Sequence, residues 1–120
     1  MKKAVILFLM ISLLVGCATV TLYRAVGDNK AKLSRLAVGM SKDEALAIMG
    51  TKPIILPDTI INNPYRIASI HGARQKFEIV YYVTDVLVED GIIDDNELTP
   101  IVFFNNELQG WGWDYVNNIR

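Results

Sequence analysis

The chain has 120 residues, and its 12 Lys and Arg against 13 Asp and Glu give a formal net charge of −1 at pH 7. This length makes one small domain, and the charge balance lacks the concentrated basic surface that nucleic-acid binding requires. The sequence holds a single cysteine, so a disulfide within the chain and a metal site built on several cysteines are excluded. The fold must therefore be stabilised by an ordinary hydrophobic core.

The N-terminal segment has the pattern of a signal peptide. Lys2 and Lys3 precede an apolar run, Ala4 to Val15, in which Ser12 is the one polar residue. The run is shorter than the about 20 apolar residues that a membrane-spanning helix requires. A signal peptide is therefore favoured over a membrane-anchoring helix, which is the alternative.

The residues Leu14-Val15-Gly16-Cys17 resemble a bacterial lipobox, which is the most specific motif in the sequence. The thiol of Cys17 can carry a thioether-linked lipid, and the small Gly16 lets a signal peptidase approach the backbone. The resemblance implies removal of residues 1–16, cleavage between Gly16 and Cys17, and acylation of the new amine with fatty acids such as palmitate. Ala18 resembles a residue that permits export, which implies a lipid anchor in the bacterial outer membrane and a domain facing the periplasm.

Charge is unevenly distributed along the chain. Residues 17–76 contain nine Lys and Arg but four Asp and Glu, whereas residues 77–119 contain nine Asp and Glu and no Lys or Arg. Two interpretations are open. Either the two halves complement each other within the fold, or an acidic face is offered to a basic partner or a cation.

The stretch after the lipobox is predicted to be a tether. Residues 18–27 show no strong hydrophobic period, so we expect a lipidated tether over residues 17–28 and a single domain over residues 29–120. About ten extended residues can reach about 35 Å. Such a tether would lift the domain clear of the lipid headgroups.

Two helices are predicted at the start of the domain. Asp28 or Asn29 can cap a first short helix, which Gly39 can end. The second helix is predicted over residues 41–49, because Ser41 and Glu44 form a capping box ahead of apolar residues at helical spacing. A glycine in the left-handed conformation can end this helix at position 50.

The remainder of the chain is predicted to be an antiparallel sheet. Alternating apolar residues and turn signals predict strands at residues 65–71, 77–83, 101–104 and 107–113. Two helices followed by such a meander predict an α+β domain. We expect two layers, with the two N-terminal helices packed on one four-stranded antiparallel sheet.

The pattern "L..GMS..EAL.IMG..P", between a lipobox and an antiparallel sheet, resembles the small bacterial lipoproteins of the SmpA/OmlA (BamE) type. The layout also resembles the repeats of the β-lactamase-inhibitor-protein fold, and "NPYR", "YYVTD", "DDNELTP" and "LQGWGW" look like a lipoprotein group that shares it. BamE-type proteins help to assemble outer-membrane β-barrels. The resemblance thus implies a role in outer-membrane assembly or integrity, and it carries no partner-contact residue over to this chain.

The stretch "GWGW" supplies the candidate protein-binding residues. On a strand, Trp111 and Trp113 share one face, while Gly110 and Gly112 leave the other nearly bare. Either both tryptophans pack under the helices, or they form an exposed aromatic patch of the kind that anchors protein interfaces. Tyr81 or Tyr82 on a neighbouring strand could extend either arrangement, and Tyr82 is taken as the candidate.

The stretch "EDGIIDDNEL" resembles the second half of an EF-hand loop. Asp90, Asp94 and Glu97 would be its ligands, but Val86 and Val88 occupy the first two positions that need oxygen ligands. We therefore expect a solvated acidic loop without a tight calcium site. Weak cation binding by these three carboxylates is the alternative.

The sequence contains no nucleophile elbow, no glycine-rich phosphate loop and one histidine, so we expect neither an enzyme nor a bound cofactor. The leading hypothesis is an envelope lipoprotein, anchored through a covalent lipid on Cys17, that acts through protein contacts in outer-membrane assembly or integrity. The first alternative is a binding module that inhibits or senses a periplasmic protein. The second is a weak cation-responsive module that uses the acidic loop at residues 85–97.

Overall fold

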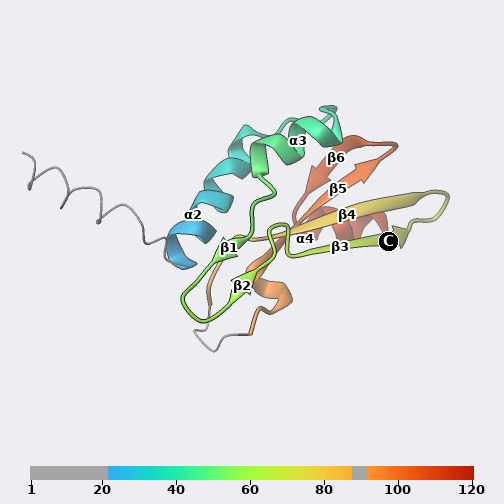
Figure 1. Cartoon of the computed structure of the whole chain (residues 1–120). Helices are drawn as coiled ribbons and strands as arrows, with labels where there is room; N and C mark the ends of the chain where they lie inside the picture. Colours follow the sequence, from blue (N-terminus) through green and yellow to red (C-terminus); the bar gives the residue numbers. More distant parts are fainter. Residues whose placement is uncertain (1–21, 88–91) are drawn as a thin grey trace, which may run out of the picture.

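The computed structural model describes residues 22–87 and 92–120 of the chain (Figure 1). Its helices and strands are α2 (Leu22–Lys32), η1 (Leu33–Arg35), α3 (Lys42–Met49), β1 (Ile54–Ile55), β2 (Ile60–Ile61), β3 (Arg66–His71), β4 (Lys76–Val83), η2 (Asp95–Glu97), β5 (Leu98–Phe104), β6 (Glu107–Trp111) and α4 (Trp113–Ile119), where η marks a 3-10 turn. The predicted α+β class is confirmed.

The main sheet is an antiparallel meander. Its strands lie in the order β3-β4-β5-β6, so each pairs with its neighbour in the chain. The first three predicted strands are confirmed, and the fourth ends at Trp111 rather than at residue 113. A separate two-stranded hairpin, β1–β2, places Ile55 opposite Ile60.

Helices cover both faces of the main sheet. The buried residues of one face, which we call the α3 face, are Leu36, Ala45, Met49, Val80, Tyr82, Ile101, Phe103 and Leu108. Those of the opposite face, the α4 face, are Val26, Phe77, Ile79, Tyr81, Val83, Leu98, Val102 and Val116. The predicted two-layer arrangement is therefore wrong, because α4 adds a layer that the sequence did not predict. Gly112, with a φ of +98°, turns the chain from β6 into this helix.

The helix α3 matches its prediction because its signals are local. The hydroxyl of Ser41 accepts the backbone N–H of Glu44 at 3.1 Å, which satisfies one of the unpaired donors of the first turn. Asp43 and Glu44 lie at the positive end of the helix dipole. Gly50 follows with a φ of +86°, a conformation that a residue with a Cβ rarely adopts.

The helix α2 differs from its prediction. It begins at Leu22, so Asp28 and Asn29 lie inside it and neither caps its start. Asn29 is buried, and its side-chain amide donates to the carbonyl of Val83 at 3.0 Å and to Oδ1 of Asn63 at 2.9 Å. These bonds hold α2 across the end of β4. The predicted tether over residues 17–28 is wrong from residue 22 onward, since that part is helical.

Candidate interaction surfaces

The structure separates the two tryptophans that the sequence placed on one face. Trp111 ends β6 and packs on the α3 face, whereas Trp113 begins α4 and packs on the α4 face. The indole N–H of Trp113 donates to the carbonyl of Leu98 at 3.0 Å, and its ring centroid lies 5.8 Å from that of Tyr81. The prediction that both tryptophans share one face is therefore wrong, because the turn at Gly112 directs the two side chains to different layers.

The other parts of the predicted aromatic site are also covered. A Cβ on Gly110 would lie 2.7 Å from the ring of Tyr115, so that α4 packs directly on this backbone. Tyr82 is fully buried, and its hydroxyl donates to the carbonyl of Gly50 at 2.8 Å. Burial raises the pKa of Tyr82 to about 12. In this structure Tyr82 links β4 to the end of α3 and is not available for contact with a partner.

The acidic loop is less solvated than predicted. Glu97 is buried, and its carboxylate accepts the backbone N–H groups of Leu87 at 3.1 Å and Asp94 at 3.0 Å. Both oxygens are thus used to fix the loop before β5, which leaves them unsuited to a cation. Asp94 is exposed, and Asp90 lies outside the described residues. Within residues 22–87 and 92–120, no group of three or more acidic, His or Cys side chains could hold a metal ion.

The predicted lipidation site lies outside the structure's described part. Gly16 and Cys17 both precede Leu22, the first described residue. None of the helices in the described ranges has the length and hydropathy of a membrane span. The lipid anchor therefore stays a prediction from the lipobox.

The outer edge of β6 is closed by the chain between η1 and α3. The N–H of Leu108 donates to the carbonyl of Met40, and its carbonyl accepts the N–H of Gly39, both at 2.8 Å. Ser41 adds an isolated antiparallel bridge to Glu107. Both backbone groups of Leu108 on this edge are therefore paired within the chain.

Within residues 22–87 and 92–120, the outer edge of β3 is open. β3 is the terminal strand of the sheet and pairs with β4 on one side. The N–H of Gly72 donates to the carbonyl of Gln75 at 2.8 Å at the adjoining turn. Because hydrogen-bonded pairs alternate along an antiparallel ladder, the backbone groups of Ile67, Ser69 and His71 point away from β4. Across the described residues, no other backbone group bonds to them.

The side chains beside this edge are exposed as well. Ile67 is 61% exposed, and Ser69 and His71 are also exposed. They lie on the side of the sheet that α3 covers farther along, over β4 to β6, and an ion pair between Lys42 and Glu78 lies next to them. The strand β3 therefore presents unpaired backbone groups and an apolar side chain together.

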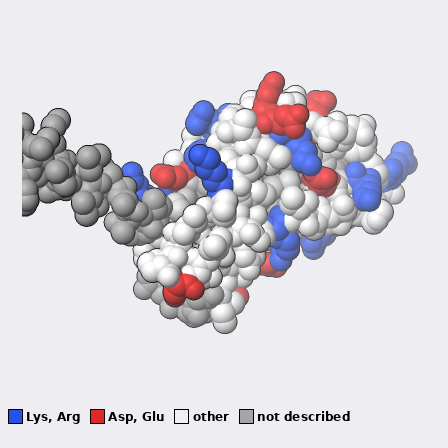
Figure 2. Space-filling view, viewed as in Figure 1, with Lys and Arg blue, Asp and Glu red and all other residues white. Residues whose placement is uncertain are grey.

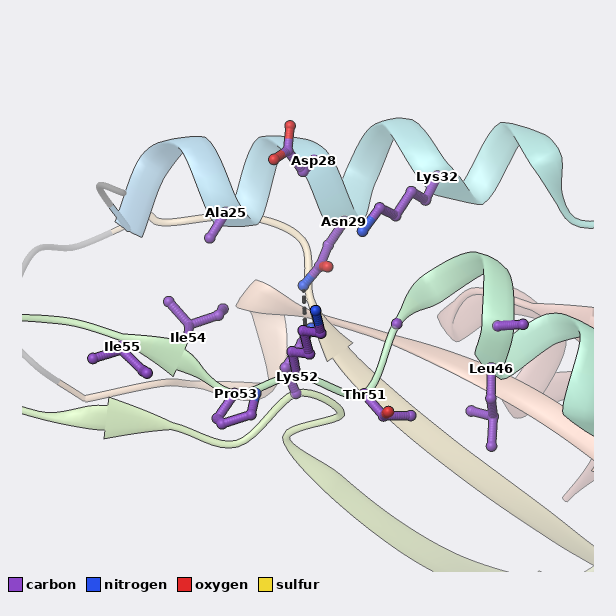
Figure 3. A pocket seen from close by; sticks show the side chains of 13 residues that line it. Ala25, Asp28, Asn29, Lys32, Leu46, Thr51, Lys52, Pro53, Ile54 and Ile55 are labelled. Carbon is purple, nitrogen blue, oxygen red and sulfur yellow. Dashed lines mark hydrogen bonds between the residues drawn. The ribbon is translucent and has the colours of Figure 1, made fainter. Parts of the chain in front are cut away.

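A positively charged cavity lies between α2 and the chain that joins α3 to β1. It has a volume of about 650 Å³. Figure 3 shows Lys32 and Lys52 pointing toward the side chain of Asn29, which the bond to Val83 holds in place. Asp28 also lines the cavity, so the two ammonium groups outnumber one carboxylate there.

A second, more apolar groove lies at the end of the molecule where α2 begins. Its volume is about 590 Å³, and Leu22, Ile60, Ile92 and Asp58 are among its lining residues. Ile60 and Ile92 are 64% and 63% exposed, and Ile55, opposite Ile60 on the hairpin, is 68% exposed. In Figure 2 the surface over the hairpin is mostly uncharged.

Neither the hairpin nor the open edge was predicted from the sequence. The signal for the hairpin is "IILPDTII", in which two isoleucine pairs flank the turn-forming Pro57-Asp58. The strand at residues 66–71 was predicted, but its position at the edge depends on what packs beside it. No local pattern carries that information.

These features define a small α+β domain with a four-stranded antiparallel meander covered on both faces. The model of a protein family of unknown function, DUF3192, matches residues 23–118, and the chain belongs to that family. No curated protein and no solved structure matches the chain. The resemblance to lipoproteins of the SmpA/OmlA type stays a prediction.

Proposed function

We propose that this protein is a lipid-anchored, non-enzymatic component of the bacterial cell envelope that binds another envelope protein through the open edge of β3. The observation that carries the proposal is the contrast between the two sheet edges. The chain covers the edge of β6 at Leu108 with its own segment around Gly39 and Met40, whereas the edge of β3 has no such cover in the described residues. The lipobox at residues 14–17 supports the anchor.

The chemistry of the edge indicates the kind of partner. Unpaired N–H and C=O groups on an outer strand pair with an extended segment, which gives affinity, while side-chain pockets give specificity. The exposed side chain of Ile67 favours a partner strand with an apolar residue beside it. Such a partner fits a role in outer-membrane assembly or integrity, where β-strands from several proteins are present.

The test is site-specific photo-crosslinking in intact bacteria. A photoreactive amino acid replaces Ile67 in the full chain, and a matched control replaces Val38, which is similarly exposed on the loop before α3. We expect a specific adduct from position 67 and none from position 38. An adduct with twice the mass of the chain would instead identify a second copy of this protein.

A pair of variants at one residue tests whether the backbone makes the contact. Ser69→Pro removes an N–H that points away from β4, while Ser69→Ala keeps that N–H and removes the hydroxyl. We expect the adduct from position 67 to disappear in Ser69→Pro and to persist in Ser69→Ala, with both variants folded by circular dichroism. Equal adducts in the two variants would contradict strand pairing.

A binding module that inhibits or senses a soluble periplasmic protein would use the same edge. The two functions differ in their need for the anchor. A variant that lacks the lipid, Cys17→Ser exported by a cleavable signal peptide, would keep its adduct if the partner is soluble. We expect the adduct to be strongly reduced if the partner lies in the membrane.

A further inference from the structure

We propose that the apolar end of the molecule, formed by the β1–β2 hairpin with Leu22 and Ile92 beside it, rests on the lipid bilayer. This inference concerns a different surface from the β3 edge, and it rests on the lipid anchor of the proposed function. The end carries three strongly exposed apolar side chains: Ile55 and Ile60, which face each other on the hairpin, and Ile92, which lines the same groove as Ile60. Large exposed apolar side chains gathered at one groove mark a contact with a membrane or a partner.

The geometry of the chain favours the membrane. Leu22 lines the same groove as Ile60 and Ile92, and it lies five residues after Cys17. Whatever the conformation between them, five residues span at most about 18 Å. A lipid on Cys17 therefore keeps this groove close to the bilayer surface. The structure thus reverses the expectation of a long tether that would lift the domain away.

The arrangement of the elements agrees with this orientation. In Figure 1 the start of α2 and the β1–β2 hairpin lie at one end, and the β3–β4 turn lies at the other. In Figure 2 the described surface over the hairpin is mostly uncharged, with an acidic group on it. The open edge of β3 extends away from this end, so a domain resting on its hairpin would leave that edge accessible from the periplasm.

Charge sets the depth of the contact. Asp58 lies in the hairpin turn and lines the groove, and a carboxylate is costly to place in hydrocarbon. Ile55 and Ile60, on either side of the turn, would therefore enter the boundary between headgroups and acyl chains and no deeper. Apolar side chains of interfacial proteins reach about 5–10 Å into that boundary.

The test measures contact between single positions and lipid. Cysteine replaces Ile60 in one variant and Val38, similarly exposed on the loop before α3, in the control. Cys17 is the single cysteine of the chain, and a thioether would block its sulfur, so each variant has one free thiol. The lipidated proteins are labelled with an environment-sensitive fluorophore and reconstituted into vesicles of phosphatidylethanolamine and phosphatidylglycerol that contain a lipid-borne doxyl quencher.

We expect quenching at Ile60→Cys to exceed that at Val38→Cys by about threefold or more, because one label enters the interface and the other stays in water. Equal, weak quenching, with mass spectrometry showing lipid on Cys17, would overturn the bilayer contact and leave the anchor intact. Protein from envelopes without lipid on Cys17 would overturn the anchor and this inference together. A label at position 60 that is unquenched in vesicles but shielded in native envelopes would assign this end to a protein partner instead.

Discussion

The two outer strands of the main sheet differ in whether their outward backbone groups are hydrogen-bonded within the described part of the chain. Leu108 of β6 has both backbone groups bonded to the segment at residues 39–40, and its side chain is fully buried. Ile67 of β3 points its backbone groups away from the sheet and exposes its side chain. Because an open edge invites unwanted pairing, the contrast between the two edges in the described residues supports the proposal that the β3 edge binds a partner.

The largest expected difference between the edges is in stability. Leu108→Ala should lower the free energy of unfolding by about 2–5 kcal/mol, because it opens a cavity in the α3 face. Ile67→Ala should change it by no more than about 0.5 kcal/mol, since its side chain is exposed. Urea unfolding followed by circular dichroism measures both. Equal losses of stability would mean that the Ile67 side chain is packed in the isolated protein. That result would contradict the contrast between the two edges.

The strands between the two edges should lose stability at high pH, because Tyr82 of β4 is buried in its protonated form. Tyr82 has a folded pKa of about 12 and an ordinary value near 10 when unfolded, so the unfolded chain loses its proton first as the pH rises. The stabilisation is fully present below pH 10, and about 2–3 kcal/mol of it is lost between pH 10 and about 12.

Tyr82→Phe is the matched variant for this measurement. It should cost about 1 kcal/mol at neutral pH through loss of the hydrogen bond to Gly50. In return, this variant should lose less stability than the wild type between pH 10 and 12. Parallel pH profiles of the two proteins in urea unfolding would contradict the assignment to Tyr82.

The closed edge should also depend on the cap of α3. Ser41→Ala should lower the free energy of unfolding by about 1 kcal/mol, because the N–H of Glu44 loses its acceptor. Amide exchange at Leu108 should become faster, since Ser41 lies in the segment that covers β6. Ser41→Asp supplies another good capping acceptor and should restore most of both values. Unchanged exchange at Leu108 in Ser41→Ala would show that the cap of α3 does not stabilise the segment that covers β6.

The smallest expected effect concerns the ion pair between Lys42 and Glu78, which joins α3 to the sheet near the open edge. Both side chains are partly exposed, so Glu78→Gln should change the free energy of unfolding by about 0–1 kcal/mol. The difference from wild type should vanish in about 1 M salt, where screening is strong. A larger, salt-independent loss would show that Glu78 has a structural role beyond this pair.

The sequence predicted the elements whose causes are local. The helix α3 follows from Ser41 and Glu44, three residues apart, and the strand β4 follows from the alternation of "KFEIVYYV". The start of α2 could not be predicted in this way. Asn29 is a typical capping residue, yet its amide bonds to Val83, 54 residues later, inside a helix. A tertiary contact decided its role.

The candidate site was harder to predict than the fold, for a related reason. One glycine, Gly112, turns the chain and sends Trp111 and Trp113 to opposite faces of the sheet. Glu97, a candidate ligand from sequence, accepts the N–H of Leu87 across the loop. The positions of sheet edges likewise depend on which strands find neighbours, so the open edge of β3 became visible only in three dimensions.

Hydrogen–deuterium exchange of the peptide that covers residues 66–71 tests the central claim most directly. It should be measured by mass spectrometry on the purified protein and again on the protein in native envelope membranes. We expect the amides of Ile67, Ser69 and His71 to exchange rapidly in isolation and to be protected in the membranes, with Ser69→Pro abolishing the added protection at the other two. Equal exchange in both samples would contradict binding through the β3 edge.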